Sequence, residues 1–303
     1  MRLPPPLSPG AKVALVAPSG PLRDEQDLTR ALQATRSMGW EPVVGEYVLE
    51  RAGYLAGTDA HRVDDLNRFA RDDSIDGIWC IRGGYGAGRL LDAIDYDAWR
   101  RHPKTLIGYS DITALHCAIG RMADLVTFHG PTARGAAQEE SAHSLRCAVT
   151  TRDGQYFCRT PAMVALRPGR ARGRLVGGNL AVLTSIMGTP YAPEFDGGIL
   201  VLEDVNESVY RIDRMLTQLR LARALDRLAG LVFGAFTDIP PEPSDEQRSL
   251  EDLLAEFADR TGVPCVSNFP MGHIGFQWTI PLGAVAELDV DNKTVVTGIE
   301  YPD

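Results

Sequence analysis

Short apolar runs alternate with amphipathic stretches between Lys12 and Phe128, and this alternation restricts the fold more than any other feature of the chain. Strands that alternate with helical segments are typical of a parallel sheet covered by helices. The first half of the chain is therefore expected to be an α/β unit with a parallel sheet. Its predicted strands are Lys12–Ala17, Pro42–Val44, Asp76–Ile81, Lys104–Gly108 and Leu125–Phe128.

Two amphipathic segments between the first three strands have their apolar residues on one helical face. Asp24 precedes the first segment and Thr58 precedes the second, and both residue types are preferred N-caps because their side-chain oxygens accept a free backbone N–H. We expect both apolar faces to belong to the core. They consist of Leu28, Ala31, Leu32, Thr35 and Met38 in the first segment and Val63, Leu66, Phe69 and Ala70 in the second.

The chain has 303 residues and exceeds the size at which one hydrophobic core keeps growing, so two domains are expected. Four arginines between Arg167 and Arg174 alternate with Pro, Gly and Ala and show no apolar period, which predicts a linker or crossing segment. A solvated basic loop is favoured over an anion site there. We therefore divide the chain into residues 1–165 and 166–303, the second being a mixed α/β domain. Its predicted helices are Asn179–Met187, Glu207–Ala224 and Asp245–Arg260, and its predicted strands are Ile199–Glu203, Leu228–Phe236, Pro264–Ser267, Ala284–Asp289 and Thr294–Ile299.

The net charge is −9, from 31 basic and 40 acidic side chains. This balance lacks the basic footprint of proteins that bind nucleic acid or anionic membranes. No apolar segment approaches the roughly 20 residues of a membrane span. The five cysteines form no C-x-x-C pair, so no zinc or redox motif is predicted. We expect a cytoplasmic protein without nucleic-acid or membrane partners.

One serine, Ser110, lies between the strand that ends at Gly108 and an amphipathic helix that begins near Ile112. This position is at the carboxyl edge of the sheet, where open α/β folds bind ligands. It resembles the nucleophile elbow, G-x-S-x-G, which exposes a serine hydroxyl on a sharp turn, although Ile112 takes the place of the second glycine. The alternative is that Ser110 only caps the helix that follows it.

A nucleophilic serine needs a base, and His273 is the best placed of the six histidines. It lies in the loop Met271–Gly275, a position from which a side chain can reach a site built elsewhere. Glu203 comes directly after the apolar strand and is the candidate for orienting the base. His129, at a strand end, is a candidate substrate contact. Metal binding by His273 and Glu203 is the competing interpretation, but the chain has no second His at i+4 and no H-E-x-x-H motif.

The glycine-rich stretch Arg82–Arg89 follows a predicted strand and opens a helix. It does not fit a dinucleotide fingerprint, because Arg89 stands where the third glycine is needed, and no Lys-Ser/Thr pair follows for a P-loop. Glycines allow close approach of the backbone to a ligand, and free N–H groups at a helix start are suited to an anion or a developing oxyanion. A tight turn without a ligand is the alternative.

Short stretches along nearly the whole chain form one further pattern. They are Val13–Gly20, Gly53–Gly57, Ile81–Gly86, Gly108–Asp111, Gly177–Leu180, Leu202–Glu207 with Tyr210–Arg214, and Gly272–His273 with Pro281–Gly283. Taken together and in this order, they resemble the LD-carboxypeptidase family, the muramoyltetrapeptide carboxypeptidases that include the microcin C immunity peptidases.

The resemblance implies a serine peptidase with Ser110 as nucleophile, Glu203 as orienting carboxylate and His273 as general base and acid. It also implies an oxyanion hole from the backbone N–H groups of Gly84 and Asp111. In this family an α/β domain carries the serine, and a second domain supplies the other two residues across the interface. Family members remove the terminal D-alanine from L,D-linked muropeptide tetrapeptides in the cytoplasm during cell-wall recycling, and many are dimers. We therefore expect a homodimeric hydrolase without a cofactor.

A carboxypeptidase must also bind the free carboxylate of its substrate, and a guanidinium can hold a carboxylate bidentately. Arg82, beside the glycine turn, is the candidate for this contact, with a surface salt bridge as its alternative role. Gly83 and Tyr109 are the other expected substrate contacts.

Two other functions stay open. A microcin-immunity-type peptidase cleaves the amide of an aminoacyl-nucleotide analogue and stacks the nucleobase on an aromatic side chain. Phe276 and Trp278 closely follow His273, although Trp278 is equally suited to packing inward from a strand. A non-catalytic muropeptide-binding module is the other function, and the presence of all three triad residue types argues against it.

Overall fold

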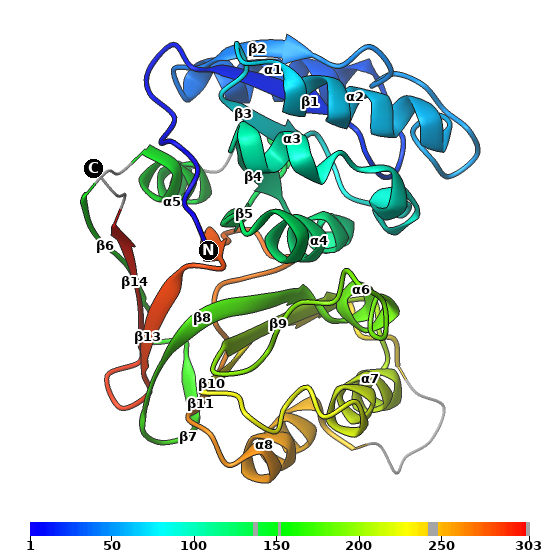
Figure 1. Cartoon of the computed structure of the whole chain (residues 1–303). Coiled ribbons are helices and arrows are strands. Elements are labelled where there is room, and N and C mark those ends of the chain that lie inside the picture. The colour runs from blue at the N-terminus through cyan, green and yellow to red at the C-terminus, as the bar shows by residue number, and fades with distance from the viewer. Residues whose placement is uncertain (136–138, 151–152, 242–247, 301–303) are drawn as a thin grey trace.

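The computed structural model describes residues 1–135, 139–150, 153–241 and 248–300. These residues form a two-domain α/β structure with one six-stranded and one eight-stranded sheet, drawn one above the other in Figure 1. In the described ranges, no helix is both long enough and apolar enough to cross a membrane.

The first sheet has the strand order β12-β5-β4-β3-β1-β2. Its five N-terminal strands are parallel, as predicted, and β12 is antiparallel to β5. The strands are β1 (Lys12–Val16), β2 (Glu41–Val44), β3 (Gly77–Cys80), β4 (Thr105–Gly108), β5 (Thr127–His129) and β12 (Ile280–Leu282).

The helices between these strands begin where the sequence predicts. The Asp24 carboxylate accepts a hydrogen bond from the Asp27 N–H at 3.1 Å, and the Thr58 hydroxyl accepts one from the His61 N–H at 3.2 Å, so both predicted caps are confirmed. The helices are α1 (Glu25–Ser37), α2 (Asp59–Arg71), α3 (Tyr96–Arg101), α4 (Thr113–Ala123) and α5 (Glu139–Thr150), with the short 3-10 turns η1 (Ala87–Ala93), η2 (Ser110–Ile112) and η3 (Ala133–Gly135).

The second sheet is mixed, with the strand order β6-β14-β13-β8-β9-β10-β11-β7. Strands β8 to β11 are parallel to one another, and the remaining neighbours pair antiparallel. The strands are β6 (Asp153–Arg159), β7 (Val164–Arg167), β8 (Arg170–Asn179), β9 (Ile199–Val205), β10 (Gly230–Thr237), β11 (Cys265–Ser267), β13 (Val285–Asp289) and β14 (Thr294–Glu300), and the helices are α6 (Leu180–Ser185), α7 (Val209–Leu221) and α8 (Leu250–Thr261).

The arginine-rich stretch is not a linker, so that prediction is wrong. Residues Arg170 to Arg174 begin β8 and pair with β13 in an antiparallel register. Arg170 and Arg172 face acidic residues of β13, at 2.9 Å from Asp289 and 3.6 Å from Glu287. Opposite charges on facing strands stabilise a sheet, so the arginines here are cross-strand partners, and their alternation is a strand period.

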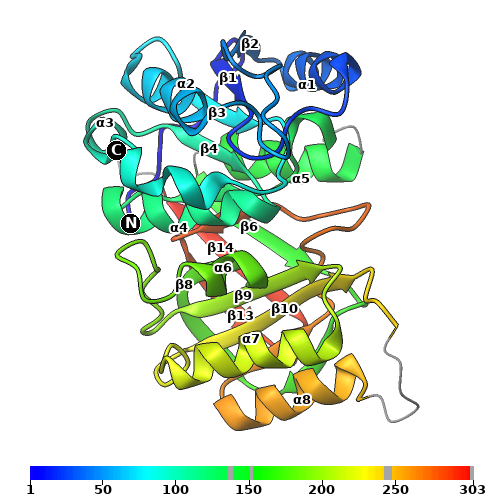
Figure 2. The same ribbon diagram turned by 90° about the vertical axis from the view of Figure 1, so that its right-hand side faces the viewer.

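The chain passes between the two sheets more than once. β6 and β7 precede or span residue 165 but belong to the second sheet, and β12 returns from the second half to the edge of the first. The predicted boundary at residue 165 stays a prediction, because sheet membership alone divides the chain at several points. Helix α4 and helix α6 face each other between the sheets in Figure 2.

The contact between α4 and the start of α6 is closely fitted. The N–H of Asn179 donates a hydrogen bond to the hydroxyl of Thr113, the first residue of α4, at 2.9 Å. A Cβ on Gly178 would lie 2.6 Å from that same hydroxyl, and the φ of Gly178 is +133°, which only glycine adopts readily. The second domain is therefore in contact with the helix that follows Ser110.

Candidate active site

Ser110 lies on a sharp turn at the carboxyl end of β4. Its φ is +66°, in the left-handed region that a non-glycine residue adopts only when its surroundings impose it. A Cβ on Gly108 would lie 3.0 Å from Ile112, so glycine is needed where the chain doubles back. Helix α4 begins at Thr113, after Ile112, so Ser110 is not its N-cap. The backbone resembles a nucleophile elbow although the second glycine of that motif is missing.

His273 and Glu203 lie beside this serine and form a continuous hydrogen-bonded chain with it. The Nε2 of His273 is 3.1 Å from the Oγ of Ser110, and its Nδ1 is 2.9 Å from the Oε2 of Glu203. The Glu203 side chain is fully buried, whereas His273 is 21% exposed and can be reached by a substrate. A nucleophile, a base and an orienting carboxylate in this order are the parts needed for acyl transfer.

Two glycines let the His273 loop lie directly on β9 and β10. A Cβ on Gly272 would be 2.7 Å from the Oε2 of Glu203, and the φ of Gly272 is +110°. A Cβ on Gly234 of β10 would be 2.8 Å from the carbonyl oxygen of Met271. The N–H of Ala235 donates to that same oxygen at 2.9 Å. Close contacts with β9 and β10 thus fix the loop immediately before His273.

The glycine-rich loop lies against the serine. A Cβ on Gly83 would be 3.0 Å from the Cβ of Ser110, and Gly84 has a φ of +126°. Within the described ranges, no hydrogen bond uses the N–H groups of Gly83 and Gly84. Asp111 is in the first turn of η2, where N–H groups have no intrahelical acceptor. These groups are available to an oxyanion formed near Ser110.

Ser19 was not singled out in the sequence, yet it connects both loops at the site. Its hydroxyl donates to the Asp111 carboxylate at 2.6 Å, and the same carboxylate oxygen accepts from the N–H of Ala87 at 2.8 Å. The N–H of the next residue, Gly20, donates to the carbonyl of Gly83 at 3.2 Å. The loop after β1 therefore fixes the serine turn and the glycine loop relative to each other.

Replacing Ser19 by Ala is expected to lower kcat about 10-fold, because the Asp111 turn and the glycine loop lose a shared anchor. A hydrogen bond to a buried charged group contributes about 1.5–3 kcal/mol, so urea unfolding should show a loss of that size. Thr35→Ala is the matched control, since the Thr35 hydroxyl is also buried but bonds within α1, at 2.8 Å from the carbonyl of Ala31. An unchanged kcat in Ser19→Ala would show that Ser19 has only a structural role.

Tyr109 packs beside the base. Its ring centroid is 4.9 Å from that of His273 and 6.0 Å from that of His129. Burial, with a smaller contribution from the charge of Glu203, raises the pKa of the Tyr109 hydroxyl above its usual value. His129 has no exposed surface, so its expected role as a substrate contact is wrong. The aromatic ring of Tyr109 instead separates His273 from a buried histidine.

The two aromatic residues after His273 differ in environment. Trp278 is buried and packs edge-on against Phe269, with ring centroids 5.8 Å apart, so it is a core residue. Phe276 is 39% exposed and remains accessible to a ligand. Within the described part of the chain, no group of three or more His, Cys, Asp or Glu side chains is arranged to hold a metal ion.

Among the residues that the structure describes, Arg82 has no salt-bridge partner. Its Nη1 donates to the carbonyl of Pro21 at 2.6 Å and its Nε donates to the carbonyl of Gly83 at 3.1 Å. The other end of its loop lines a cavity of about 770 Å³ between the two domains. The lining includes Tyr85, Gly86, Asp111, Ala181 and Tyr191.

Two family models match this chain and together cover most of it. The model of the LD-carboxypeptidase N-terminal domain matches residues 13–130, and the model of the LD-carboxypeptidase C-terminal domain matches residues 172–288. The chain belongs to the LD-carboxypeptidase family. The predicted family is therefore confirmed, and both domains of an LD-carboxypeptidase are present in order.

Several relatives match this chain over nearly their full length. A probable murein peptide carboxypeptidase of Bacillus subtilis is 37% identical, covering 96% of this chain and 92% of that protein. The murein tetrapeptide carboxypeptidase of Pseudomonas aeruginosa is 34% identical, covering 92% and 93%.

Solved structures are similar over the whole chain. The microcin C7 self-immunity protein MccF, in complex with glutamyl sulfamoyl guanosine, superposes with a TM-score of 0.91 at 26% identity and covers 100% of both chains. The muramoyltetrapeptide carboxypeptidase of Oxalobacter formigenes has a TM-score of 0.86 at 29% identity and covers 97% of this chain and 100% of that one.

Proposed function

We propose that this protein is a serine carboxypeptidase that hydrolyses the L,D-peptide bond releasing the terminal D-alanine from muramoyl tetrapeptides. The observation that carries the proposal is the hydrogen-bonded chain from Ser110 through His273 to Glu203. The names of the Bacillus, Pseudomonas and Oxalobacter relatives support a murein peptide as the substrate class. A homodimer and a cytoplasmic location stay predictions.

In the proposed reaction, Nε2 of His273 takes the Ser110 proton while Oγ attacks the carbonyl carbon of the scissile bond. Glu203 accepts a hydrogen bond from Nδ1–H, which keeps the lone pair of Nε2 directed at the serine. The N–H groups of Gly84 and Asp111 stabilise the oxyanion. One such donor typically lowers the activation barrier by about 2.7–4 kcal/mol. His273 then protonates the departing alanine nitrogen. Water, deprotonated by His273, hydrolyses the acyl-enzyme and restores Ser110.

Product analysis tests this proposal. Purified protein is incubated with a muramoyl tetrapeptide, and mass spectrometry is expected to detect a product shorter by one alanine. A tetrapeptide that ends in an L,L-bond serves as the matched control and should stay intact. A serine-directed phosphonate should form a stoichiometric adduct on Ser110 that Ser110→Ala lacks. Alanine release that persists in Ser110→Ala contradicts the assignment, and the absence of an adduct favours a binding module.

A second candidate is the cleavage of aminoacyl-nucleotide amides. The exposed ring of Phe276 near His273 and the likeness to the MccF complex favour it. Turnover of aspartyl sulfamoyl adenosine and of a muramoyl tetrapeptide should be compared as kcat/KM. We expect the tetrapeptide to be preferred, and a preference for the nucleotide analogue would replace the first proposal by the second.

A further inference from the structure

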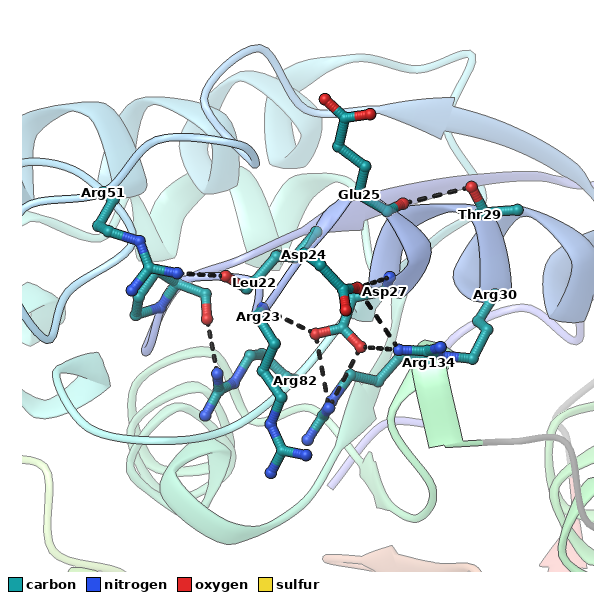
Figure 3. Close-up of polar contacts among 11 residues, drawn as sticks. Leu22, Arg23, Asp24, Glu25, Asp27, Thr29, Arg30, Arg51, Arg82 and Arg134 are labelled. Carbon is teal, nitrogen blue, oxygen red and sulfur yellow. Dashed lines mark hydrogen bonds and ion pairs between the residues drawn. The ribbon is translucent and has the colours of Figure 1, made fainter.

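Four arginines from separate segments of the first domain gather beside the glycine-rich loop (Figure 3). We call Arg23, Arg51, Arg82 and Arg134 the arginine cluster. Arg23 precedes α1, Arg51 lies between β2 and α2, Arg82 follows β3, and Arg134 is in η3. Figure 3 shows the four side chains around the segment of Leu22, Arg23 and Asp24 that precedes α1.

The positive charge of the arginine cluster is only partly neutralised by the acidic side chains around it. The fully buried Asp27 carboxylate contacts Arg30 at 2.5 Å and Arg134 at 3.3 Å, and it accepts the Arg23 N–H at 2.9 Å. Arg51 and Arg82 instead donate to the carbonyl oxygens of Leu22 and Pro21. No salt bridge reaches Arg23, Arg51 or Arg82 in the part of the chain that the structure describes. Because a carbonyl oxygen is uncharged, these hydrogen bonds do not neutralise the guanidinium charges of Arg51 and Arg82.

Repulsion among the arginines destabilises the charged form of Arg82. Partial burial, together with repulsion from Arg134 and Arg23, lowers the pKa of its guanidinium below the usual value. An anion placed between these side chains would remove the repulsion, since a charge-assisted hydrogen bond is stronger than a neutral one. The cluster is thus arranged to favour a negatively charged ligand.

The cluster is adjacent to the serine through the glycine loop. The Nη2 of Arg82 is 3.5 Å from the point that a Cβ on Gly84 would take, and a Cβ on Gly83 would be 3.0 Å from the Cβ of Ser110. In a peptide, consecutive Cα atoms are about 3.8 Å apart. The carboxylate of the last residue therefore lies within one residue of the carbonyl that Ser110 attacks.

The two ends of the glycine loop differ in chemistry. Arg82 is at the end beside the cluster, whereas Tyr85 and Gly86 line the cavity at the other end. That cavity also has Tyr191 and Ala181 in its wall, and its volume of about 770 Å³ exceeds that of a single residue. The loop thus separates a small cationic subsite from a larger space for the rest of a peptide.

We propose that Arg23, Arg82 and Arg134 form the subsite for the free carboxylate of the residue that is released, with the remaining peptide lying over the Tyr85 end of the loop. This inference rests on the proposed function and deepens it, because it assigns the requirement for a free carboxyl terminus to named side chains. It also sets the direction in which the substrate lies across Ser110. Arg82 and Arg134 make the main contacts with the substrate carboxylate. The exposed Arg23 adds electrostatic attraction for it at the edge of the subsite.

The test compares a tetrapeptide that has a free terminal carboxylate with the same peptide as its terminal amide. The wild type is expected to prefer the acid by at least about 10-fold in kcat/KM. Arg82→Gln and Arg134→Gln should each lower kcat/KM for the acid about 10- to 100-fold, mainly through KM, and should lower kcat/KM for the amide by a clearly smaller factor. Arg23→Gln, which removes no described side-chain contact, should weaken the preference by a smaller factor.

Arg30→Gln is the matched control, because it removes one charge from Asp27 on α1 and should keep the preference for the acid. Equal losses on acid and amide in all three cluster variants, or an unchanged preference in them, overturn the inference while the proposed function stands. Failure of the wild type to release alanine or alaninamide overturns the proposed function, and the inference falls with it.

Discussion

Exchanging Glu203 for Gln is expected to lower kcat by about 10⁴-fold, close to the effect of removing Ser110 itself. The side chain keeps its size and its buried place, but the amide nitrogen cannot accept the Nδ1–H of His273. The imidazole then adopts the tautomer with the proton on Nε2, which faces Ser110 at 3.1 Å and can no longer take its proton. Single-turnover kinetics on the tetrapeptide measure the loss.

The double variant Ser110→Ala with Glu203→Gln supplies the decisive comparison. Residues that act as one unit have strongly non-additive effects, so the double variant should be no slower than Ser110→Ala. Asp204→Asn is the matched control, since Asp204 is the buried acid next to Glu203 but bonds to the Asn179 amide and to the Ala181 N–H. Independent, multiplying losses from Ser110 and Glu203 would show that they do not share one mechanism.

Acidification from pH 7 to pH 5 is expected to lower the free energy of unfolding through two buried histidines, by about 2 kcal/mol at His116. Burial lowers the pKa of His116 to about 4, and burial with repulsion from His116 lowers the pKa of His129 well below 6.5. Below pH 6.5 the unfolded chain binds protons at both residues more readily than the folded chain does. His116 therefore lowers the free energy of unfolding by about 2 kcal/mol between pH 6.5 and pH 5, and His129 acts in the same direction.

Asp204 has the opposite effect on the free energy of unfolding as the pH falls. Burial raises its pKa to about 6, so the folded state gains a proton there as the pH falls, which returns about 1 kcal/mol. Urea unfolding of the wild type, His116→Gln and His129→Gln at both pH values separates these contributions. His116→Gln should reduce the pH-dependent loss by about 2 kcal/mol and His129→Gln should reduce it as well, with His143→Gln as the control at an exposed histidine. A wild-type pH dependence that persists in both variants would contradict this explanation.

The parts of the fold that sequence could predict are those in which local pattern and tertiary environment agree. The buried strands, the capped helices α1 and α2, and the serine at the end of β4 have regular periods and end at residues typical of caps or turns. Ser110 and His273 could be picked out as candidates because Ser110 follows a strand end and His273 lies in a loop next to a glycine. Glu203 was expected at the end of its strand, but β9 continues to Val205.

Other elements were missed for identifiable reasons. Pro281 lies inside β12, and proline normally argues against a strand; it is tolerated here because β12 is at the sheet edge. Helix α5 buries Ser141 and Ser144, so its inner face does not look apolar in the sequence and the helix was not predicted. The bond from Ser19 to Asp111 joins residues 92 positions apart. The arginine cluster likewise comes from four segments, which no local pattern brings together.

The loop that carries His273 is attached to both sheets. Before it, the Phe269 N–H donates to the carbonyl of Phe233 in β10 at 3.0 Å. After it, the Gln277 and Thr279 N–H groups donate to Ser141 and Ser144 of α5 before the chain pairs with β5 as β12. The 3.1 Å distance between the His273 imidazole and the Ser110 hydroxyl therefore depends on how the two sheets are held against each other.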